Sequence, residues 1–203
     1  MQEEVIQKYL PKYLSQNSQK ELFDDVRKFI AEDDSYRLFT KVLENEGIMY
    51  QGDGIDGFKF YSFDNESLKE APGVVLSNTC DIALENERYF PSQMMYSPII
   101  NLNKYITLLK DNKVSSQKIE AHVKSIKKQE ITQIFYIPSI EGVFDESIVF
   151  LDRISNRRNS KELTEELLKK RMFTLSNFGF YLFLLKVSIH FTRIREGVDR
   201  RIV

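Results

Sequence analysis

Between Ile48 and Ile100 the chain is a series of short apolar or alternating runs separated by turn-forming residues. Three of these runs are typical of strands: "FKFYSF", "GVVLS" and "QMMYSPII". The preceding "QGDGIDG" holds three of the eight glycines and is predicted to be a loop. Pro98 predicts that the third strand ends, bulges or lies at a sheet edge there. This texture predicts a sheet at the centre of the fold.

The segments on both sides of these strands are predicted to be helical. Residues 1–47 form a predicted helical arm, because "SQKELFDDVRKFIAE" and "DDSYRLFTKVLENEG" repeat apolar residues at helical spacing. Residues 103–129 are lysine-rich and are predicted to be a helical insertion. The last run, "TLSNFGFYLFLLKVSIHFTRIREG", is predicted to be one long helix capped near Ser176.

The remaining segments complete the predicted order. "ITQIFYIPSI" and "EGVFDESIVFLDRI" are predicted strands, and "SNRRNSKELTEELLKKR" is predicted to be an exposed loop leading into a helix. The sequence therefore predicts an α+β protein with two parts, a helical arm over residues 1–47 and one principal domain over residues 48–203.

The composition is ordinary for a globular protein, with 42% hydrophobic and 29% charged residues. The chain opens "MQEEVIQKYLPKYL", without the pattern of a secretory signal, and its longest apolar run is far shorter than the ~20 residues of a membrane span. A single cysteine is in keeping with a reducing compartment. We expect a cytoplasmic protein that does not bind a membrane.

Charge is unevenly distributed along the chain. Residues 1–102 carry 10 basic and 18 acidic side chains, whereas residues 103–203 carry 19 and 12. A basic half can attract phosphate backbones, but it can equally attract the acidic half or keep a helix face solvated.

Read from Tyr50, the order of the pieces resembles the MazF/PemK-like toxins. The resemblance rests on "QGD" before a strand, "APGVVLSN", a loop with "YFPS", "QMMYSPII", "EGVFDESIVFLDRISNR" and a final helix, and it covers about residues 50–191. It implies an SH3-like β-barrel interrupted by the insertion at 103–129. It also implies a toxin-antitoxin function, in which the family's homodimers cut single-stranded RNA without a metal.

The sequence departs from the family at the positions that matter for cleavage. Where the family usually has an arginine before a proline, this chain has Ala71. Where the family has a threonine or serine after the proline of the next strand, this chain has Ile99 and Ile100, which carry no hydroxyl. These departures favour a binding or regulatory relative of the toxins over an enzyme that uses the family's own mechanism.

The first candidate site is the polar cluster after the "GVVL" strand. It consists of Ser77, Asn78, Thr79, Cys80 and Asp81. A cysteine nucleophile needs a nearby base or positive field, and the only histidines are His122 and His190. The alternative is a small buried thiol at a strand end, with the polar neighbours bonding local backbone.

The second candidate site is basic. It comprises Arg153, Arg157, Arg158, Lys169, Lys170 and Arg171, which could neutralise phosphates while aromatic side chains stack on bases. Interleaved glutamates offer the alternative of a solvated surface with ion pairs.

No cofactor motif is present, and one cysteine with two distant histidines gives no spacing for a metal site. Two functions follow as hypotheses. The chain is an RNA-binding or RNA-cleaving module of a toxin-antitoxin or defence system, or it is a non-enzymatic subunit that binds a protein through its N-terminal helices or its arginine-rich C-terminal tail.

Overall fold

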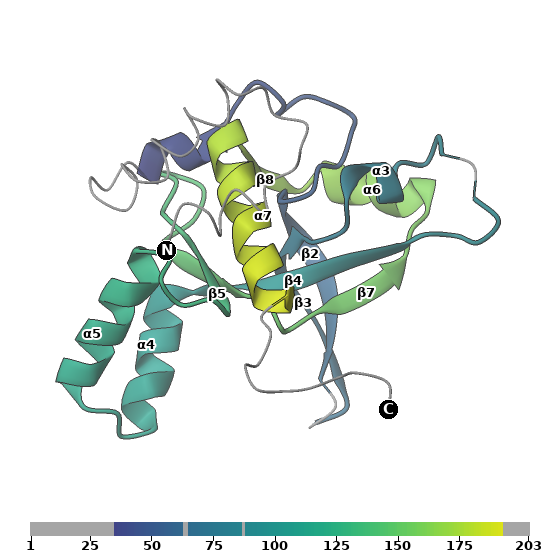
Figure 1. The fold of residues 1–203 in the computed structure, drawn as a ribbon. Helices are drawn as coiled ribbons and strands as arrows, with labels where there is room; N and C mark the ends of the chain where they lie inside the picture. The colour runs from purple at the N-terminus through teal and green to yellow at the C-terminus, as the bar shows by residue number, and fades with distance from the viewer. Residues whose placement is uncertain (1–34, 63–64, 87, 193–203) are drawn as a thin grey trace, which may run out of the picture.

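A computed structural model of the chain describes residues 35–62, 65–86 and 88–192, and the statements below concern these residues. They form an α+β fold around one antiparallel sheet of eight strands (Figure 1). The strands are β1 (Phe39–Thr40), β2 (Gly54–Ser62), β3 (Ser67–Val75), β4 (Gln93–Asn101), β5 (Ile134–Ile137), β6 (Ser147–Phe150), β7 (Ser155–Arg158) and β8 (Arg171–Leu175). The helices are η1 (Ser35–Leu38), α3 (Thr79–Ile82), α4 (Leu102–Asp111), α5 (Ser116–Lys127), α6 (Lys161–Leu168) and α7 (Asn177–Thr192).

The strand order in the sheet is β1-β8-β2-β3-β4-β6-β5, and β7 pairs with β4 as well. β1 and β5 are the two ends, and within the described residues they do not pair with each other. The predicted α+β class is confirmed, and closure into an SH3-like barrel stays a prediction.

The helices predicted for residues 103–129 and for the last run are present, whereas the reading of residues 103–129 as an insertion in a barrel stays a prediction. α4 and α5 fill the predicted segment, and α7 begins beside Ser176, whose hydroxyl accepts a hydrogen bond from the Gly179 amide at 3.1 Å. Lys186 of α7 is buried and donates to the carbonyls of Gln129 and Ile131, which ties α7 to the loop after α5. Burial lowers the pKa of Lys186 to about 7.

None of the described helices combines the length and apolarity needed to span a bilayer.

Pro98 lies within β4 and interrupts only one of its two ladders. β4 pairs with β3 on one side through Tyr96, Ser97 and Pro98. On the other side it pairs first with β7, as far as Tyr96, and then with β6, from Ile99 onward. A proline has no amide hydrogen to donate, so it fits the gap between the two partner strands. Of the three alternatives predicted at Pro98, the end of the strand is wrong, whereas Pro98 does lie where one side of β4 has no paired strand.

The register of β4 divides the apolar core between two faces of the sheet. Met94, Tyr96 and Ile100 alternate onto one face, and Ile99 points to the other. Met94 and Tyr96 pack in the cluster covered by α6, whereas Ile100 packs in the cluster covered by α4 and α5. We call this shared face the α4–α6 face. α7 covers the opposite face, where Ile99 joins the largest cluster.

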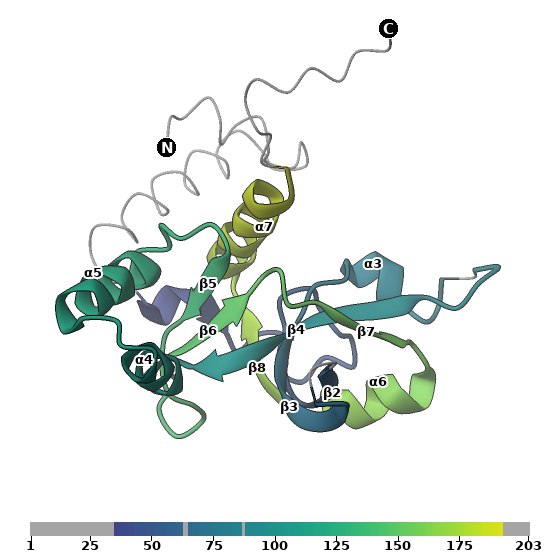
Figure 2. The ribbon, with the colours of Figure 1, turned by 90° about the horizontal axis from the view of Figure 1, so that it is seen from below.

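α6 and the α4–α5 hairpin cover different ends of the α4–α6 face. Figure 2 shows the hairpin at one end of the sheet and α6 with α3 at the other. Between them no described helix covers β4, and Phe60 and Pro98 are only half-buried there. The middle of this face is therefore only partly open to solvent.

The predicted loop "QGDGIDG" is partly strand, because Gly54 through Gly57 begin β2. The pairing of β2 with β3 shifts between Ile55 and Phe58, and Gly57 has a φ of +85°. Gly54 lies against the ring of Phe173, where a Cβ would come within 2.1 Å of a ring carbon. Gly54 therefore allows close packing against Phe173, and Gly57 allows the bulge in β2. The prediction of a loop had treated these glycines only as turn residues.

The part of the predicted arm that the structure describes is not an α-helix. Residues 35–47 form η1, the short strand β1 and a series of turns, and residues 1–34 lie outside the described residues. β1 pairs with β8, and Leu38 is fully buried beneath α7. Strand pairing and burial therefore override the helical periodicity of this segment. β8, "RMFTL", was not predicted.

A buried ion pair between Asp53 and Arg171 fixes the turns that follow β1. Asp53 is fully buried, the Arg171 side chain is only 5% exposed, and Nε of Arg171 lies 3.2 Å from Oδ2 of Asp53. The Arg171 guanidinium also donates to four backbone carbonyls, those of Leu43, Glu44, Glu46 and Ile48. Burial raises the pKa of Asp53 to about 6, while the Tyr50 amide and the Arg171 charge oppose that rise.

Replacing Arg171 is expected to destabilise the fold in a pH-dependent way. Arg171→Met leaves the Asp53 carboxylate buried without its cation, so the free energy of unfolding at pH 8 should fall by about 3–5 kcal/mol. Without the cation the folded-state pKa of Asp53 lies above 6. Protonated Asp53 then persists to a higher pH in the folded variant, so the loss of stability that begins near the ordinary pKa of 3.8 continues above pH 6 and ends only at the higher folded-state pKa.

The stability difference between wild type and Arg171→Met should therefore widen between pH 6 and pH 8, as measured by urea unfolding. Lys170→Met is the matched control, because Lys170 is exposed and its loss should change stability by no more than about 0.5 kcal/mol. A pH-independent difference would show that Asp53 and Arg171 are not coupled.

Candidate functional site

The predicted catalytic loop after β3 is built from hydrogen bonds to its own backbone and to neighbouring strands. The buried Ser77 hydroxyl accepts from the Met95 amide at 2.8 Å and donates to the Gln93 carbonyl at 3.3 Å. Asn78 caps α3, and its side-chain oxygen accepts from the Cys80 amide at 2.9 Å. Ser77 thus holds the loop on β4, and Asn78 holds the first turn of α3.

Thr79 and Asp81 also have partners. The Thr79 hydroxyl accepts from the Gln51 amide at 3.0 Å, and exposed Asp81 forms an ion pair with Arg88 at 3.1 Å. Four of the five predicted loop residues are thus engaged in contacts that fix the chain. The structure brings the five together, but neither His122 nor His190 bonds them.

Cys80 is exposed, unlike the buried thiol of the alternative prediction. His122 lies on α5 and bonds Tyr105, and Figures 1 and 2 show α5 and α3 at opposite ends of the sheet. His190 lies in the last turn of α7, and neither histidine bonds the loop. A thiolate nucleophile at Cys80 therefore lacks the neighbouring base that it would need.

The exposure of Cys80 can be tested by thiol labelling. We expect an aromatic disulfide reagent to modify one thiol per chain in the native protein at the rate of a cysteine in a short peptide. Unfolding the protein in urea should add no further labelling, and Cys80→Ser should abolish it. Labelling that requires urea would contradict the exposed position of Cys80.

The three predicted basic residues after α6 divide between interior and surface. Arg171 is buried against Asp53, so its guanidinium is not available to a ligand at the surface. Lys170 pairs with Glu166 at 3.4 Å on the exposed face of α6. Lys169, the C-cap residue of α6, is exposed. The structure therefore leaves only the two lysines at the surface.

Arg157 and Arg158 lie next to each other on β7 but point to opposite faces. Arg157 pairs in register with Met94 and so shares the α4–α6 face, whereas Arg158 pairs with Gln93 and lies on the other face. Arg153 is in the turn that precedes β7. All three are exposed, and within the described part of the chain none has a carboxylate partner.

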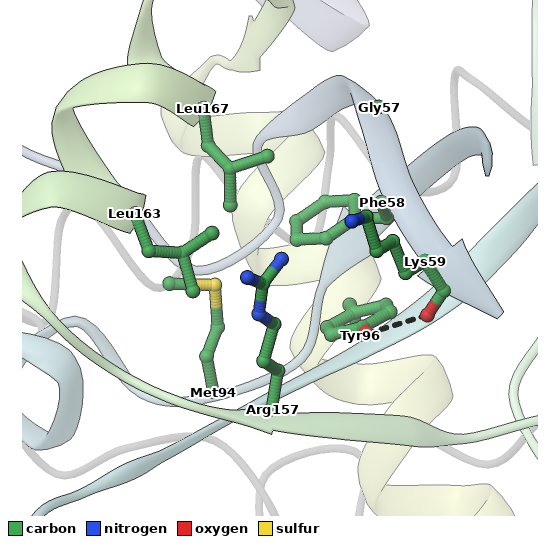
Figure 3. A pocket seen from close by; sticks show the side chains of 8 residues that line it. All are labelled: Gly57, Phe58, Lys59, Met94, Tyr96, Arg157, Leu163 and Leu167. Carbon is green, nitrogen blue, oxygen red and sulfur yellow. Dashed lines mark hydrogen bonds between the residues drawn. The ribbon is translucent and has the colours of Figure 1, made fainter.

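Arg157 lies in a shallow apolar recess between the sheet and α6 (Figure 3). The recess is formed by Gly57, Phe58, Lys59, Met94, Tyr96, Leu163 and Leu167 around the arginine. The rings of Phe58 and Tyr96 stack with their centroids 4.1 Å apart, and the Tyr96 hydroxyl donates to the Lys59 carbonyl at 2.7 Å. No space remains for a water molecule. The side chain of Arg157 is thus supported along its apolar stem.

The environment of Arg157 is partly desolvated. Burial raises the pKa of Tyr96, and the positive charge of Arg157 opposes that rise. The arginine is therefore close enough to act on the tyrosine, and among the described residues it has no carboxylate partner. Because the recess itself is filled, an anion would meet this cation at the exposed rim of the recess.

Arg153 is held by an aromatic ring at the other end of the same face. Its guanidinium carbon lies 4.0 Å from the centroid of Phe150, and the Phe150 ring contacts Tyr105 edge-on at 5.6 Å. Phe150 packs in the cluster under α4 and α5. Burial raises the pKa of Tyr105, and the charge of Arg153 opposes that rise. Arg153 and Arg157 thus flank the open middle of the α4–α6 face.

Sequence reasoning found the two arginines and missed their aromatic supports. Phe58, Tyr96, Phe150 and Tyr105 come from four different elements, and only the sheet register brings them beside the arginines. No local motif marks such a site. The only sequence signal was the abundance of aromatic residues in the predicted strands.

A larger cavity of about 470 Å³ lies at the other end of the sheet, against β1 and β8. Phe39, Ile140, Met172 and Phe173 supply apolar walls, and Arg171 at its border is already committed to Asp53. The exposed charged residues on its rim are of both signs, and no histidine or cysteine lines it. This cavity has neither a nucleophile with a base nor a field that favours one charged ligand.

The described residues contain no cluster of three or more histidine, cysteine or acidic side chains able to hold a metal ion. At the positions where the MazF/PemK resemblance implies catalysis, Ala71 pairs with Phe58 inside the sheet and Ile99 is buried.

The chain matches no protein-family model, and no curated protein sequence matches it significantly.

Proposed function

We propose that the chain binds single-stranded RNA through the open middle of the α4–α6 face. The observation that carries this proposal is the pair Arg153 and Arg157, which flank one face and have no carboxylate partner among the residues that the structure describes. Phosphate is the anion that such a pair suits, because a guanidinium donates two parallel hydrogen bonds to it.

The supports of the two arginines favour binding for a second reason. A long cationic side chain normally loses rotamer freedom when it binds, at a cost of about 0.5–1.5 kcal/mol. Contact with Phe150 restricts Arg153, and Arg157 extends into the recess that Phe58 and Tyr96 help to line. The half-buried ring of Phe60 between them offers a further contact for a base.

The proposal includes kinship with the MazF/PemK-like toxins, an SH3-like arrangement of the strands and a role in the cytoplasm. The order of the sequence pieces supports this kinship. It does not extend to the family's own cleavage chemistry, since Ala71 and Ile99 occupy the positions of its catalytic side chains. Lys169 and Lys170 would extend the phosphate path along α6.

Binding can be measured by fluorescence anisotropy with a labelled single-stranded RNA of mixed sequence. We expect wild type to bind at low salt, with an affinity that falls between about 50 and 200 mM salt. Arg153→Ala and Arg157→Ala should each weaken binding several-fold and reduce the salt slope by about 1.

Lys41→Ala is the control for this measurement, because Lys41 is an exposed cation beyond β1 at the other end of the sheet. It should bind RNA as wild type does. Absence of binding by wild type at low salt would remove the proposal. Full binding by both arginine variants would remove the α4–α6 face as its site.

A second candidate is a non-enzymatic subunit that binds a protein. Tyr89 and Phe90, in the loop before β4, are 104% and 84% exposed, which is unusual for two adjacent aromatic side chains. Aromatic residues of this kind anchor many protein interfaces. The predicted contacts of the N-terminal helices and the C-terminal tail lie outside the described residues.

Co-expression with the products of neighbouring genes tests this candidate. A partner that co-purifies with wild type should be lost from the double variant Tyr89→Ser/Phe90→Ser. It should be retained by Tyr61→Ser, which removes a half-exposed aromatic residue from the β2–β3 hairpin. A partner retained by the double variant would exclude this loop as the interface.

A further inference from the structure

We propose that Tyr105, His122 and Arg153 form a site that binds a terminal phosphate monoester, the group at the end of a 5′-phosphorylated RNA strand. The inference rests on the proposed RNA binding and names the kind of RNA that the α4–α6 face would prefer. The site lies where Arg153 borders that face, on α4, α5 and the turn before β7. Its role is recognition, and no covalent bond changes there.

The first part of the site is a hydrogen-bonded pair on the helical hairpin. The Tyr105 hydroxyl of α4 lies 3.0 Å from Nε2 of His122 on α5, and both side chains are half-buried. Within the described residues Nδ1 of His122 has no hydrogen bond and is not a buried unpartnered atom, so it is accessible to solvent. When Tyr105 donates to Nε2, the imidazole hydrogen is on Nδ1 and is available to a ligand. A protonated imidazole donates from both nitrogens, which releases the Tyr105 hydroxyl for the ligand as well.

The second part of the site is the cation. The Arg153 guanidinium rests on the ring of Phe150, and that ring contacts Tyr105 edge-on. The positive charge of Arg153 also acts on the Tyr105 hydroxyl and opposes the rise of its pKa on burial. A guanidinium, a phenol and an imidazole from three elements therefore come to one place.

The acidic residues of the adjoining segments are engaged elsewhere. Asp152 accepts a hydrogen bond from Gln133, and Glu146 pairs with Lys127 and with the Tyr136 hydroxyl. Among the described residues no ion pair joins a carboxylate to the arginine of the site. The site therefore keeps a positive charge and hydrogen-bond donors for an anion.

A terminal phosphate fits this set of donors better than a phosphate inside the strand. A phosphate monoester carries about −1.5 to −2 charges at pH 7 and offers three acceptor oxygens. A phosphodiester carries a single charge, and only two of its oxygens are not esterified. The guanidinium of Arg153 can bond two oxygens of a monoester, and Nδ1 of His122 can donate to the third.

The position of the hairpin explains why this phosphate would be at the end of the strand. The α4–α5 hairpin stands at one end of the sheet in Figure 2 and flanks the middle of the α4–α6 face on that side. A strand that runs from Arg157 toward Arg153 therefore reaches the hairpin, where Tyr105 contacts the ring that supports Arg153. Arg157 remains available to a phosphate further along the strand.

The hairpin does not need the polar pair for its own packing. Leu102, Ile119 and Ile126 supply its buried apolar contacts with the sheet. A tyrosine and a histidine at the surface, next to an arginine without a carboxylate partner, are better explained by binding of an anion than by packing.

The test compares RNA ends with the full-length protein. Three RNAs of one mixed sequence, labelled on an internal base, carry a 5′-phosphate, a 5′-hydroxyl or a 3′-phosphate, and their Kd values are measured by fluorescence anisotropy. We expect the 5′-phosphate to strengthen binding roughly tenfold over the 5′-hydroxyl, as charge-assisted hydrogen bonds allow. The 3′-phosphate should give no such gain, and a gain from the 3′-phosphate alone would overturn the assignment.

Three variants locate the gain. Arg153→Ala, Tyr105→Phe and His122→Gln should each reduce it to about twofold or less, because each removes a donor to the phosphate. His122→Gln retains a polar group near the position of Nε2 but lacks Nδ1. The gain is a ratio of two Kd values for one protein, so a general loss of affinity or stability in a variant does not change it.

Lys124→Ala is the matched control on the same helix. Lys124 is exposed and lies two residues after His122 on α5, so it points about 200° away around the helix. The variant loses a cation but should keep the full gain from the 5′-phosphate. Loss of the gain in Lys124→Ala as well would show that the effect is only one of net charge and would overturn the site.

A titration with adenosine 5′-monophosphate, with adenosine as its blank, separates this inference from the proposed function. If wild type binds both RNA ends equally, or if Arg153→Ala and His122→Gln keep the gain, the inference is overturned and RNA binding stands. If the RNAs do not bind but the nucleotide binds in a way that requires Arg153 and His122, the phosphate site is supported and the RNA path is wrong. If the nucleotide binds as tightly as the 5′-phosphorylated RNA, the ligand is a free nucleotide and the strand end is overturned.

Discussion

The buried ion pair between Asp53 and Arg171 is the interaction on which the rest of the structure depends. It joins the start of β2 to the start of β8, and through four carbonyls it also fixes the turns between β1 and β2. Burial of a carboxylate is costly, and here the cost is reflected in its raised pKa. The pair is tolerable because the guanidinium satisfies backbone groups that would otherwise lack donors. The ion pair also helps to position β8 between β1 and β2, so that the sheet continues on both sides of β8.

The position of the candidate site follows from how β4 changes partner. β4 is long enough to pair with β7 at one end and β6 at the other, and Pro98 lies at the change. α6 packs over the first half of the α4–α6 face and the α4–α5 hairpin over the second. The segment joining β6 to β7 must pass the uncovered middle, and it carries Arg153 there, close to Arg157 of β7. Two cations thus border a gap that the topology itself creates, each beside an aromatic ring of the adjacent core.

The two predicted sites have different physical characters. The loop at Ser77–Asp81 is polar because a tight turn after a buried strand must satisfy its own backbone, and most of its side chains do so. Among the described residues, the side chains of Arg153 and Arg157 form no hydrogen bond or ion pair. Polar groups that are satisfied mainly stabilise the fold, whereas charged groups supported by packing and left without a counter-charge are free to bind a ligand. This contrast favours the arginine-bearing face over the cysteine loop.

The sequence by itself determined the α+β class, the helices within residues 103–129, the long last helix and the arginines near Asp152. Local periodicity, capping and turn chemistry act within a few residues, and these features depend on nothing else. The tertiary structure decided the rest. It turned residues 35–47 from a predicted helix into turns and a strand, because β8 offered pairing and Arg171 offered donors to four carbonyls. It buried Arg171 while leaving Arg157 exposed, and it paired Tyr105 with His122 across two helices. Contacts between residues far apart in the chain depend on strand register and helix packing, which no single segment encodes.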